Sequence, residues 1–403
     1  MQEIIIAKPY EFIPPHRGNL APTLIQSFRI VDWYLRKYEG VVSHEVRGID
    51  HLKESLRAGH GIVLAPNHCR YADPIAMGWL ARKAGTHVFA MASWHLFNQG
   101  WLQAFAMRMC GGFSVYREGI DRQSLETAVD ILAQASRPLV VFPEGTVFRT
   151  NDIVQPLLDG VAFLARSAAR RREKQSHGKV VIHPIAIKYL FRGDVQSSVE
   201  PIVTDLENRF SWQSTGPRGD LIARVTRLEA ALLALKEIQH LGSPQMGSLS
   251  ERRAGLISHL LGTTEEKWLG RIQSDQKMIP RIKQLRVKMV PKLIDPHTSQ
   301  TDINAIWADL AKLYLAQQIG SYPAGYLDQP TDTRLLETVE RLDEDITDRA
   351  RIHRPLHAIL QVDQPIEVDC EKPPRGVEDP VMTELQLRLE TMLAPLASEA
   401  CPL

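Results

Sequence analysis

The chain has no long hydrophobic run and no secretory leader. No apolar stretch in its 403 residues approaches the roughly 20 residues that a membrane-spanning helix needs. The first residues lack the basic and apolar regions of a signal peptide. We therefore expect a cytoplasmic protein that meets a membrane only at its surface.

Cysteine and net charge are also scarce. The four cysteines, Cys69, Cys110, Cys370 and Cys401, lie far apart and form no CxxC pair, which favours a reducing compartment and predicts no bound metal. A formal net charge of +1 argues against general nucleic-acid binding, so any anion site must be local. The 44% hydrophobic and 24% charged residues are ordinary globular usage, enough for a large domain with an insertion or for two domains.

The chain is organised around residues 67–73, which read Asn-His-Cys-Arg-Tyr-Ala-Asp. This segment follows an apolar run at 61–66, typical of a buried strand, and precedes Pro74 at the start of a helical pattern. A strand-to-helix turn can fold Asp73 back to accept the imidazole N–H of His68, leaving the other ring nitrogen free to take a proton. Alternatively, Asp73 only caps the helix and His68 is a structural histidine.

Strand and helix patterns alternate from residue 61 to residue 188. Buried-strand patterns occur at 61–66, 86–92, 111–117, 138–142 and 180–188, and helical patterns occur between them at 75–83, 101–109 and 121–134. This order predicts an α/β fold with a mixed, largely parallel sheet flanked by helices. Because ligands bind at the carboxyl ends of such strands, we expect His68, Arg117, Glu144 and Thr146 to converge at one edge.

The N-terminal region contains an arm and an amphipathic pattern. Residues 1–21 are rich in proline and look extended, and 23–38 predict one helix. Its apolar stripe consists of Leu24, Phe28, Val31, Leu35 and Tyr38. The stripe could lie in a bilayer interface, or it could cover the protein's own core.

Four of these segments together resemble the glycerolipid acyltransferase family, typified by lysophosphatidate acyltransferases. The matching blocks, in order, are Asn67, His68 and Asp73; Gly111 to Arg117; Phe142-Pro-Glu-Gly-Thr146; and the apolar strand that contains Pro184. Any one block is weak, whereas four in order are specific. The resemblance covers roughly residues 40–190 and a closing strand near the C-terminus.

The resemblance implies transfer of an acyl group from acyl-CoA or acyl carrier protein to a hydroxyl of a glycerol-phosphate or lysophospholipid acceptor. A hydroxyl is a poor nucleophile until a base takes its proton, and His68, oriented by Asp73, fits that role. Such a base typically contributes about 10²–10⁴-fold to the rate. No acyl-enzyme and no cofactor are needed, so we do not expect Cys69 to be a nucleophile.

The resemblance also implies substrate-binding residues. Arg117 offers a planar fork for phosphate, the Gly145 backbone and the Thr146 hydroxyl can complete an anion cradle, and Glu144 can orient the acceptor or form the pocket wall. The remaining candidates are Asn67, Arg70, Gly112 and Pro184. Structural alternatives are an ion pair of Arg117 with Glu118 or Asp121, and a helix-start role for Glu144.

Three positions depart from the family pattern. Many members have a small hydroxyl residue in place of Arg70, arginine in place of Val147, and phenylalanine in place of Ser114. Arg149 is a possible substitute for the arginine missing at position 147. Because these positions border the acceptor pocket in the family, they bear on which acceptor is used.

The expected division of the chain has four parts. Residues 1–40 form the arm and amphipathic helix, 41–195 the acyltransferase core, 196–353 an inserted helical subdomain, and 354–403 the closing strand and last helix. Within the insertion, a basic helix at 281–293 could approach phosphates, or it could pair with an acidic helix at 335–348; we favour the pairing.

Three other functions remain to be weighed. The acceptor could be a lyso-lipid without glycerol, or the protein could be a non-catalytic lipid-binding scaffold. A metal-dependent hydrolase is a third possibility, although the sequence shows no further convergent His/Asp set. In the favoured interpretation the partners are the thioester donor, the acceptor lipid and the inner face of a membrane, with no nucleic acid.

Overall fold

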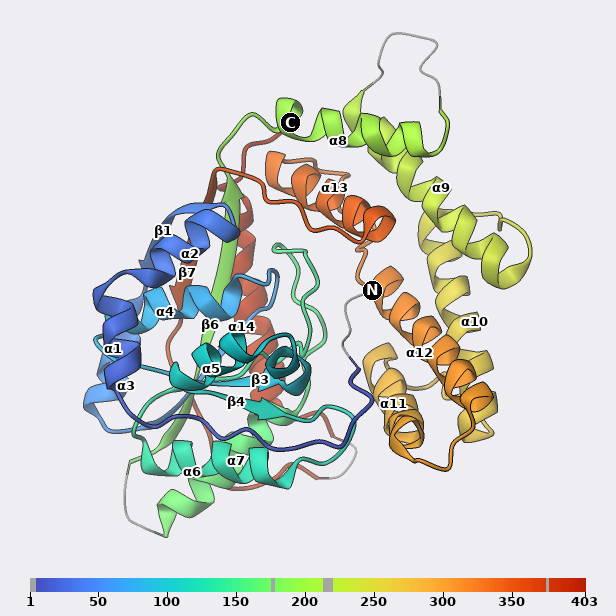
Figure 1. Ribbon diagram of the computed structural model, residues 1–403. Coiled ribbons are helices and arrows are strands. Elements are labelled where there is room, and N and C mark those ends of the chain that lie inside the picture. Colours follow the sequence, from blue (N-terminus) through green and yellow to red (C-terminus); the bar gives the residue numbers. More distant parts are fainter. Residues whose placement is uncertain (1–4, 175–177, 213–219, 375–376) are drawn as a thin grey trace.

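The computed structural model describes residues 5–174, 178–212, 220–374 and 377–403, and its centre is a mixed sheet (Figure 1). The strands are β1 (Val41–Arg47), β2 (Gly61–Pro66), β3 (Phe89–Ser93), β4 (Gly112–Val115), β5 (Leu139–Val140), β6 (Val180–Phe191), β7 (Leu356–Val362) and β8 (Ile366–Glu367). Their order is β1-β7-β6-β2-β5-β3-β4, and β8 pairs with β6. The predicted fold class is confirmed.

Strands β6, β2, β5, β3 and β4 are parallel to one another, which brings their carboxyl ends to one edge of the sheet. Strand β7 is antiparallel to β6 and parallel to β1. Since β6 lies between β2 and β7, the segment 356–362 returns into the middle of the sheet after the whole helical segment. Strand β1 was not predicted from the sequence.

Helices cover both faces of the sheet. They are α1 (Leu20–Ser27), α2 (Ile30–Tyr38), α3 (Ile49–Arg57), α4 (Asp73–Ala84), the 3-10 helix η1 (Trp94–Asn98), α5 (Trp101–Met109), α6 (Arg122–Gln134), α7 (Gly160–Glu173) and α14 (Pro380–Ala397). One hydrophobic core contains buried residues of α2, α3 and α4. A second core contains those of α6, α7 and α14.

The chain between β6 and β7 is helical, as predicted. Its helices are α8 (Val195–Arg209), α9 (Leu221–Leu241), α10 (Leu249–Leu269), α11 (Met278–Ile294), α12 (Gln300–Gly320) and α13 (Asp332–Thr347). None of the helices in the described ranges is long and apolar enough to cross a membrane.

This helical segment has two parts with different cores. Buried residues of α8, the first half of α9 and α13 join the hydrophobic core on one face of the sheet; examples are Val199, Val225 and Leu336. The end of α9 and helices α10, α11 and α12 bury their apolar residues in a separate core. Figure 1 shows α10, α11 and α12 gathered away from the sheet, while α13 lies against it. Only part of the segment is therefore a subdomain apart from the sheet.

The single N-terminal helix predicted at 23–38 is instead two helices. The chain turns between α1 and α2 at Arg29, whose φ of 51° interrupts the helical backbone. The predicted stripe is divided accordingly, because Leu35 is buried in the core and Phe28 is 73% exposed. The apolar pattern therefore serves the protein's own core through α2 and leaves α1 with exposed apolar side chains.

Candidate active site

His68 and Asp73 meet on the turn between β2 and α4. The Nδ1 atom of His68 lies 2.9 Å from Oδ2 of Asp73, at hydrogen-bond distance. Asp73 is fully buried, and the His68 side chain is 13% exposed. The turn therefore folds the carboxylate back on the imidazole, as the sequence predicts, and leaves the other ring nitrogen available.

Asp73 accepts hydrogen bonds from two backbone N–H groups, the imidazole and a tyrosine hydroxyl, and the Cys69 thiol lies 3.8 Å from its Oδ1. Its Oδ2 accepts the backbone N–H groups of Cys69 at 2.7 Å and Arg70 at 2.9 Å as well as the imidazole. Its Oδ1 accepts the hydroxyl of Tyr189 in β6 at 2.8 Å. These bonds fix the carboxylate relative to the turn before α4, and no side chain caps the start of that helix. The alternative in which Asp73 only caps the helix is therefore wrong.

The segment from Phe142 to Phe148 holds His68 from the other side. The Phe142 ring stacks on the imidazole at a centroid distance of 4.1 Å. Oε1 of Glu144 accepts the backbone N–H of His68 at 2.7 Å, and Phe148 N–H donates to the His68 carbonyl at 3.2 Å. The imidazole is thus oriented by a carboxylate at its edge and an aromatic ring against its face.

Glu144 is a buried carboxylate whose two oxygens both accept backbone N–H groups. In addition to His68, Gln155 N–H donates to Oε2 at 3.2 Å. Burial raises the pKa of Glu144 to about 8, while these two hydrogen bonds act in the opposite direction. These contacts make Glu144 a brace between the His68 turn and the chain near Gln155, rather than a residue that starts a helix.

The side chains of Asn67 and Cys69 are both buried. The Asn67 side chain exchanges two hydrogen bonds with the backbone of Ile187 in β6, at 3.0 Å and 2.7 Å. Cys69 is 1% exposed, and burial raises the pKa of its thiol well above the usual value. A thiol that stays protonated is a weak nucleophile, consistent with the role expected for Cys69. The predicted substrate contact of Asn67 is replaced by a bond between strands.

Arg70 and Arg149 are paired with the helical segment. Two nitrogens of Arg70 bind the carboxylate of Glu340 in α13, at 3.2 Å and 2.7 Å. The Arg149 guanidinium lies 3.9 Å from Glu340 and 2.8 Å from Glu344 in α13. Both arginines, which the sequence suggested for the acceptor pocket, are thus held by carboxylates of α13.

These contacts overturn the pairing predicted within the insertion. Among the described residues, no ion pair joins α11 to α13; Arg281 of α11 binds Glu265 of α10 instead. The acidic face of α13 turns toward the sheet domain because that domain contains the arginines Arg70 and Arg149. Sequence patterns show that two helices have opposite charges, but not which partners they meet in the fold.

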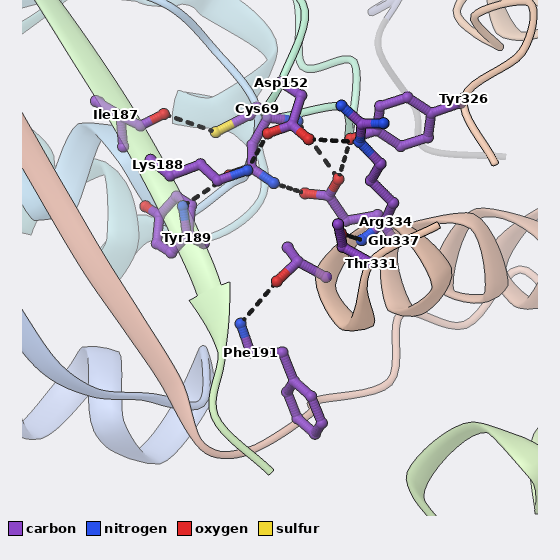
Figure 2. Close-up of polar contacts among 12 residues, drawn as sticks. Cys69, Asp152, Ile187, Lys188, Tyr189, Phe191, Tyr326, Thr331, Arg334 and Glu337 are labelled. Atoms are coloured by element: carbon purple, nitrogen blue, oxygen red, sulfur yellow. Dashed lines mark hydrogen bonds and ion pairs between the residues drawn. The ribbon is translucent and has the colours of Figure 1, made fainter. Parts of the chain in front are cut away.

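A further buried network, missed by the sequence reasoning, connects α13 with β6 (Figure 2). Asp152 forms ion pairs with Lys188 of β6 and with Arg334 of α13. Glu337 of α13 accepts hydrogen bonds from Tyr326 and Asn151. No local pattern could reveal these contacts because the partners lie far apart in the sequence.

Three other predicted positions serve the packing of the sheet. A Cβ atom on Gly112 would lie 2.8 Å from the Met107 carbonyl, so glycine lets α5 end close to β4. Pro184 is buried within β6 opposite Ala65. Ser114 is fully buried and accepts the N–H of Ile13, so it faces the N-terminal arm and not a substrate pocket.

Arg117 lies beside the turn that contains Gly145. Its Nη2 is 3.7 Å from the place that a Cβ atom on Gly145 would occupy, and Gly145 has a φ of +75°. Thr146, the next residue, is half-buried. Arg117 takes part in no ion pair with the described residues, so the predicted alternative of a salt bridge to Glu118 or Asp121 is absent. Its guanidinium is available to an anion near the Glu144 turn.

His95 of η1 is a neighbour of Arg117 that the sequence did not single out. Burial, together with the nearby charges of Arg117 and Arg286, lowers the pKa of His95 to about 4. The imidazole is therefore neutral at pH 7. Its position follows from the fold, because η1 directly follows β3, the neighbour of β4.

Comparisons with known proteins match the part of the chain that contains these residues. The family model described as Acyltransferase matches residues 45–188, which include His68, Asp73, Arg117 and the Glu144 turn. Over 161 residues the chain is 32% identical to the 1-acyl-sn-glycerol-3-phosphate acyltransferase of Streptococcus pneumoniae. That alignment covers 38% of this chain and 57% of the relative. Residues 45–188 are thus similar to proteins of the Acyltransferase family, and the alignment spans a little over half the length of the relative.

Proposed function

We propose that the protein is an acyltransferase that moves a fatty acyl group from an acyl thioester to a hydroxyl of a glycerol-phosphate or lysophospholipid acceptor. The observation that carries this proposal is the contact of 2.9 Å between His68 and the buried carboxylate of Asp73, inside the segment that matches the family. The name of the pneumococcal relative supports a glycerol-phosphate acceptor.

In the proposed reaction, Nε2 of His68 takes the proton of the acceptor hydroxyl as its oxygen attacks the thioester carbonyl carbon. The new C–O bond forms an ester, the C–S bond breaks, and the thiol of CoA or of the carrier protein leaves with a proton. Asp73 accepts the Nδ1–H and stabilises the imidazolium that forms between these events. Tyr189 holds Asp73, and Phe142 and Glu144 hold the base in place.

A membrane surface is the proposed source of the acceptor lipid. Helices α1, α2 and α5 and the turn between the first two have exposed apolar side chains. They are Leu20, Leu24, Phe28, Ile30, Trp33, Tyr38, Trp101, Leu102 and Phe105. Such side chains favour the interface of a bilayer. Phe28→Glu should weaken co-sedimentation with anionic liposomes. Leu387→Glu, which changes a leucine that is 61% exposed on α14, should not weaken it.

The purified protein tests the activity itself. Acyl-CoA and acyl carrier protein would each be incubated with glycerol 3-phosphate, lysophosphatidate, other lysophospholipids and a lyso-lipid without glycerol, and the lipid products identified. We expect an ester product with a phosphorylated glycerol acceptor. If product forms only from the lyso-lipid without glycerol, that lipid is the acceptor in place of a glycerol-phosphate lipid. Specific lipid binding without any product would favour a scaffold.

A further inference from the structure

Arg286 of α11 is a half-buried arginine with incomplete hydrogen bonding. Its Nε is shielded from solvent and has no hydrogen-bond partner, and its Nη2 donates to the neutral Gln317 side chain at 3.2 Å. No carboxylate of the described residues forms an ion pair with it. A shielded guanidinium nitrogen without a hydrogen-bond partner is unfavourable, and an anion that binds it removes this cost.

Arg286 belongs to the helical segment but faces the Arg117 region of the sheet domain. Burial and then the charge of Arg117 lower the pKa of Arg286 to about 10. The charges of both arginines also lower the pKa of His95 of η1, so both guanidinium groups lie within electrostatic range of that imidazole. Arg117 is in turn beside Gly145, the residue after the glutamate that binds the His68 backbone. The two arginines are therefore close to the candidate active site.

The charges at this place are not balanced. The negative charge of Glu118 raises the pKa of both arginines, but Glu118 forms an ion pair with neither of them. The other arginines that the sequence suggested for an anion, Arg70 and Arg149, are paired with α13. Two guanidinium groups next to one carboxylate leave a positive site at the junction of the sheet domain and α11.

We propose that Arg117 and Arg286 together bind the phosphate monoester of the acyl acceptor, so that the helical segment completes the acceptor site. Two planar forks suit a phosphate group with up to two negative charges, because each can donate two parallel N–H bonds to its oxygens. This assignment depends on the proposed function, since it takes the bound phosphate to be that of the acceptor. The acyl-CoA donor also carries phosphates, and the experiment must distinguish the two.

Binding is measured first, without catalysis. Glycerol 3-phosphate and inorganic phosphate would be titrated into the wild type, Arg286→Gln, Arg286→Lys and Lys288→Gln while the melting temperature is followed. Lys288 is exposed and lies about 200° around α11 from Arg286, which makes it a matched control. We expect both ligands to raise the melting temperature of the wild type and of Lys288→Gln. We expect Arg286→Gln to lose most of this effect and Arg286→Lys to keep part of it.

Kinetic measurements then show whether the bound phosphate belongs to the acceptor or to the acyl-CoA donor. Arg286→Gln should raise the KM for the phosphorylated acceptor about 10- to 100-fold, the loss expected for a charge-assisted hydrogen bond, and leave the KM for acyl-CoA unchanged. An unphosphorylated acceptor should be used equally by the wild type and Arg286→Gln. A raised KM for acyl-CoA alone would overturn the proposal in favour of a donor site.

Two further outcomes are decisive. Equal stabilisation of the wild type and Arg286→Gln by both ligands would remove Arg286 from the site and overturn the proposal. Phosphate stabilisation that needs Arg286, in a protein that forms no lipid product, would support the anion site and reject the proposed function. The circular dichroism spectrum of each variant shows that it is folded before either comparison is made.

Discussion

Helices α13 and α11 both belong to the segment between β6 and β7, and both direct charged side chains toward the sheet domain. On α13 the charges are matched: Glu340 binds Arg70, and Glu344 binds Arg149. On α11 Arg286 faces Arg117 without an ion-pair partner among the described residues. The paired charges fix α13 to the active-site loops, whereas the unpaired charges leave room for an anion.

The paired charges of α13 and the unpaired Arg286 of α11 contribute differently to the free energy of unfolding. Breaking a buried ion pair leaves an uncompensated charge and costs about 3–5 kcal/mol, so the buried pair of Glu340 with Arg70 is required for the folded structure. Arg286 is half-buried and has no ion-pair partner among the described residues, so it can form a charge-assisted hydrogen bond when an anion binds. The same segment of chain therefore contributes stability through one helix and, in the proposal, substrate binding through another.

The largest effect on stability is expected for Glu340→Ala. This change leaves Arg70, which is 8% exposed, without its carboxylate, so the free energy of unfolding should fall by about 3–5 kcal/mol. Glu344→Ala is the matched control, because its side chain is 22% exposed and the change should cost about 1 kcal/mol or less. Urea denaturation measures both. Equal losses would contradict the role given to Glu340.

A smaller effect is expected for Tyr189→Phe, which removes the hydroxyl that donates to Asp73. Loss of one hydrogen bond to a charged group should lower kcat roughly tenfold, with the acceptor KM little changed. Tyr326→Phe is the control, because that hydroxyl donates to Glu337 and does not touch Asp73. It should reduce stability and leave kcat near that of the wild type. An unchanged kcat for Tyr189→Phe, with a lowered kcat for Tyr326→Phe, would show that the hydrogen bond from Tyr189 to Asp73 does not contribute to catalysis.

Glu144 is a buried carboxyl group held by backbone N–H groups instead of an arginine, and it predicts a pH dependence. Its pKa is about 8 in the folded protein, above the usual 4.5. The folded state therefore binds the proton more tightly, and this contribution to stability is complete below about pH 4.5 and lost as the pH rises through 8. The stability advantage of the wild type over Glu144→Gln should shrink from pH 5 to pH 8 in urea denaturation. An advantage that is constant or grows would contradict this pKa shift.

The smallest effect is expected for the double change Lys288→Glu/Lys292→Glu. Pairing of α11 with α13 would make this change destabilising, but Lys288 is exposed and Lys292 lies over the ring of Trp268 at 5.0 Å. The free energy of unfolding should therefore change by less than about 1 kcal/mol, as for most surface substitutions. A loss comparable to that of Glu340→Ala would show that α11 has an essential charged partner.

Local sequence signals predicted the parts of the site that are made by neighbouring residues. The apolar run before residue 67 and Pro74 after it define the turn that brings Asp73 to His68. The bounds of β7 were also predicted from an apolar strand pattern. These features depend on backbone preferences and contacts over a few residues.

Features that depend on distant partners could not be predicted. Arg70 and Glu340 are 270 positions apart, and only the packing of α13 on the sheet brings them together. Arg286 was one of several basic residues in a helical pattern, and its burial beside Arg117 is visible only in the fold. Strand β1 pairs with β7 across the same long separation, which explains why it was missed.

The central claim is that His68 is the base of an acyl transfer, and one measurement tests it most directly. Product formation from acyl-CoA and the preferred acceptor would be compared for the wild type, His68→Ala and Cys69→Ser, with melting curves for all three. We expect His68→Ala to fold normally and to lose about 10²–10⁴-fold in turnover, whereas Cys69→Ser should retain transfer. Near-normal turnover of folded His68→Ala would contradict the claim.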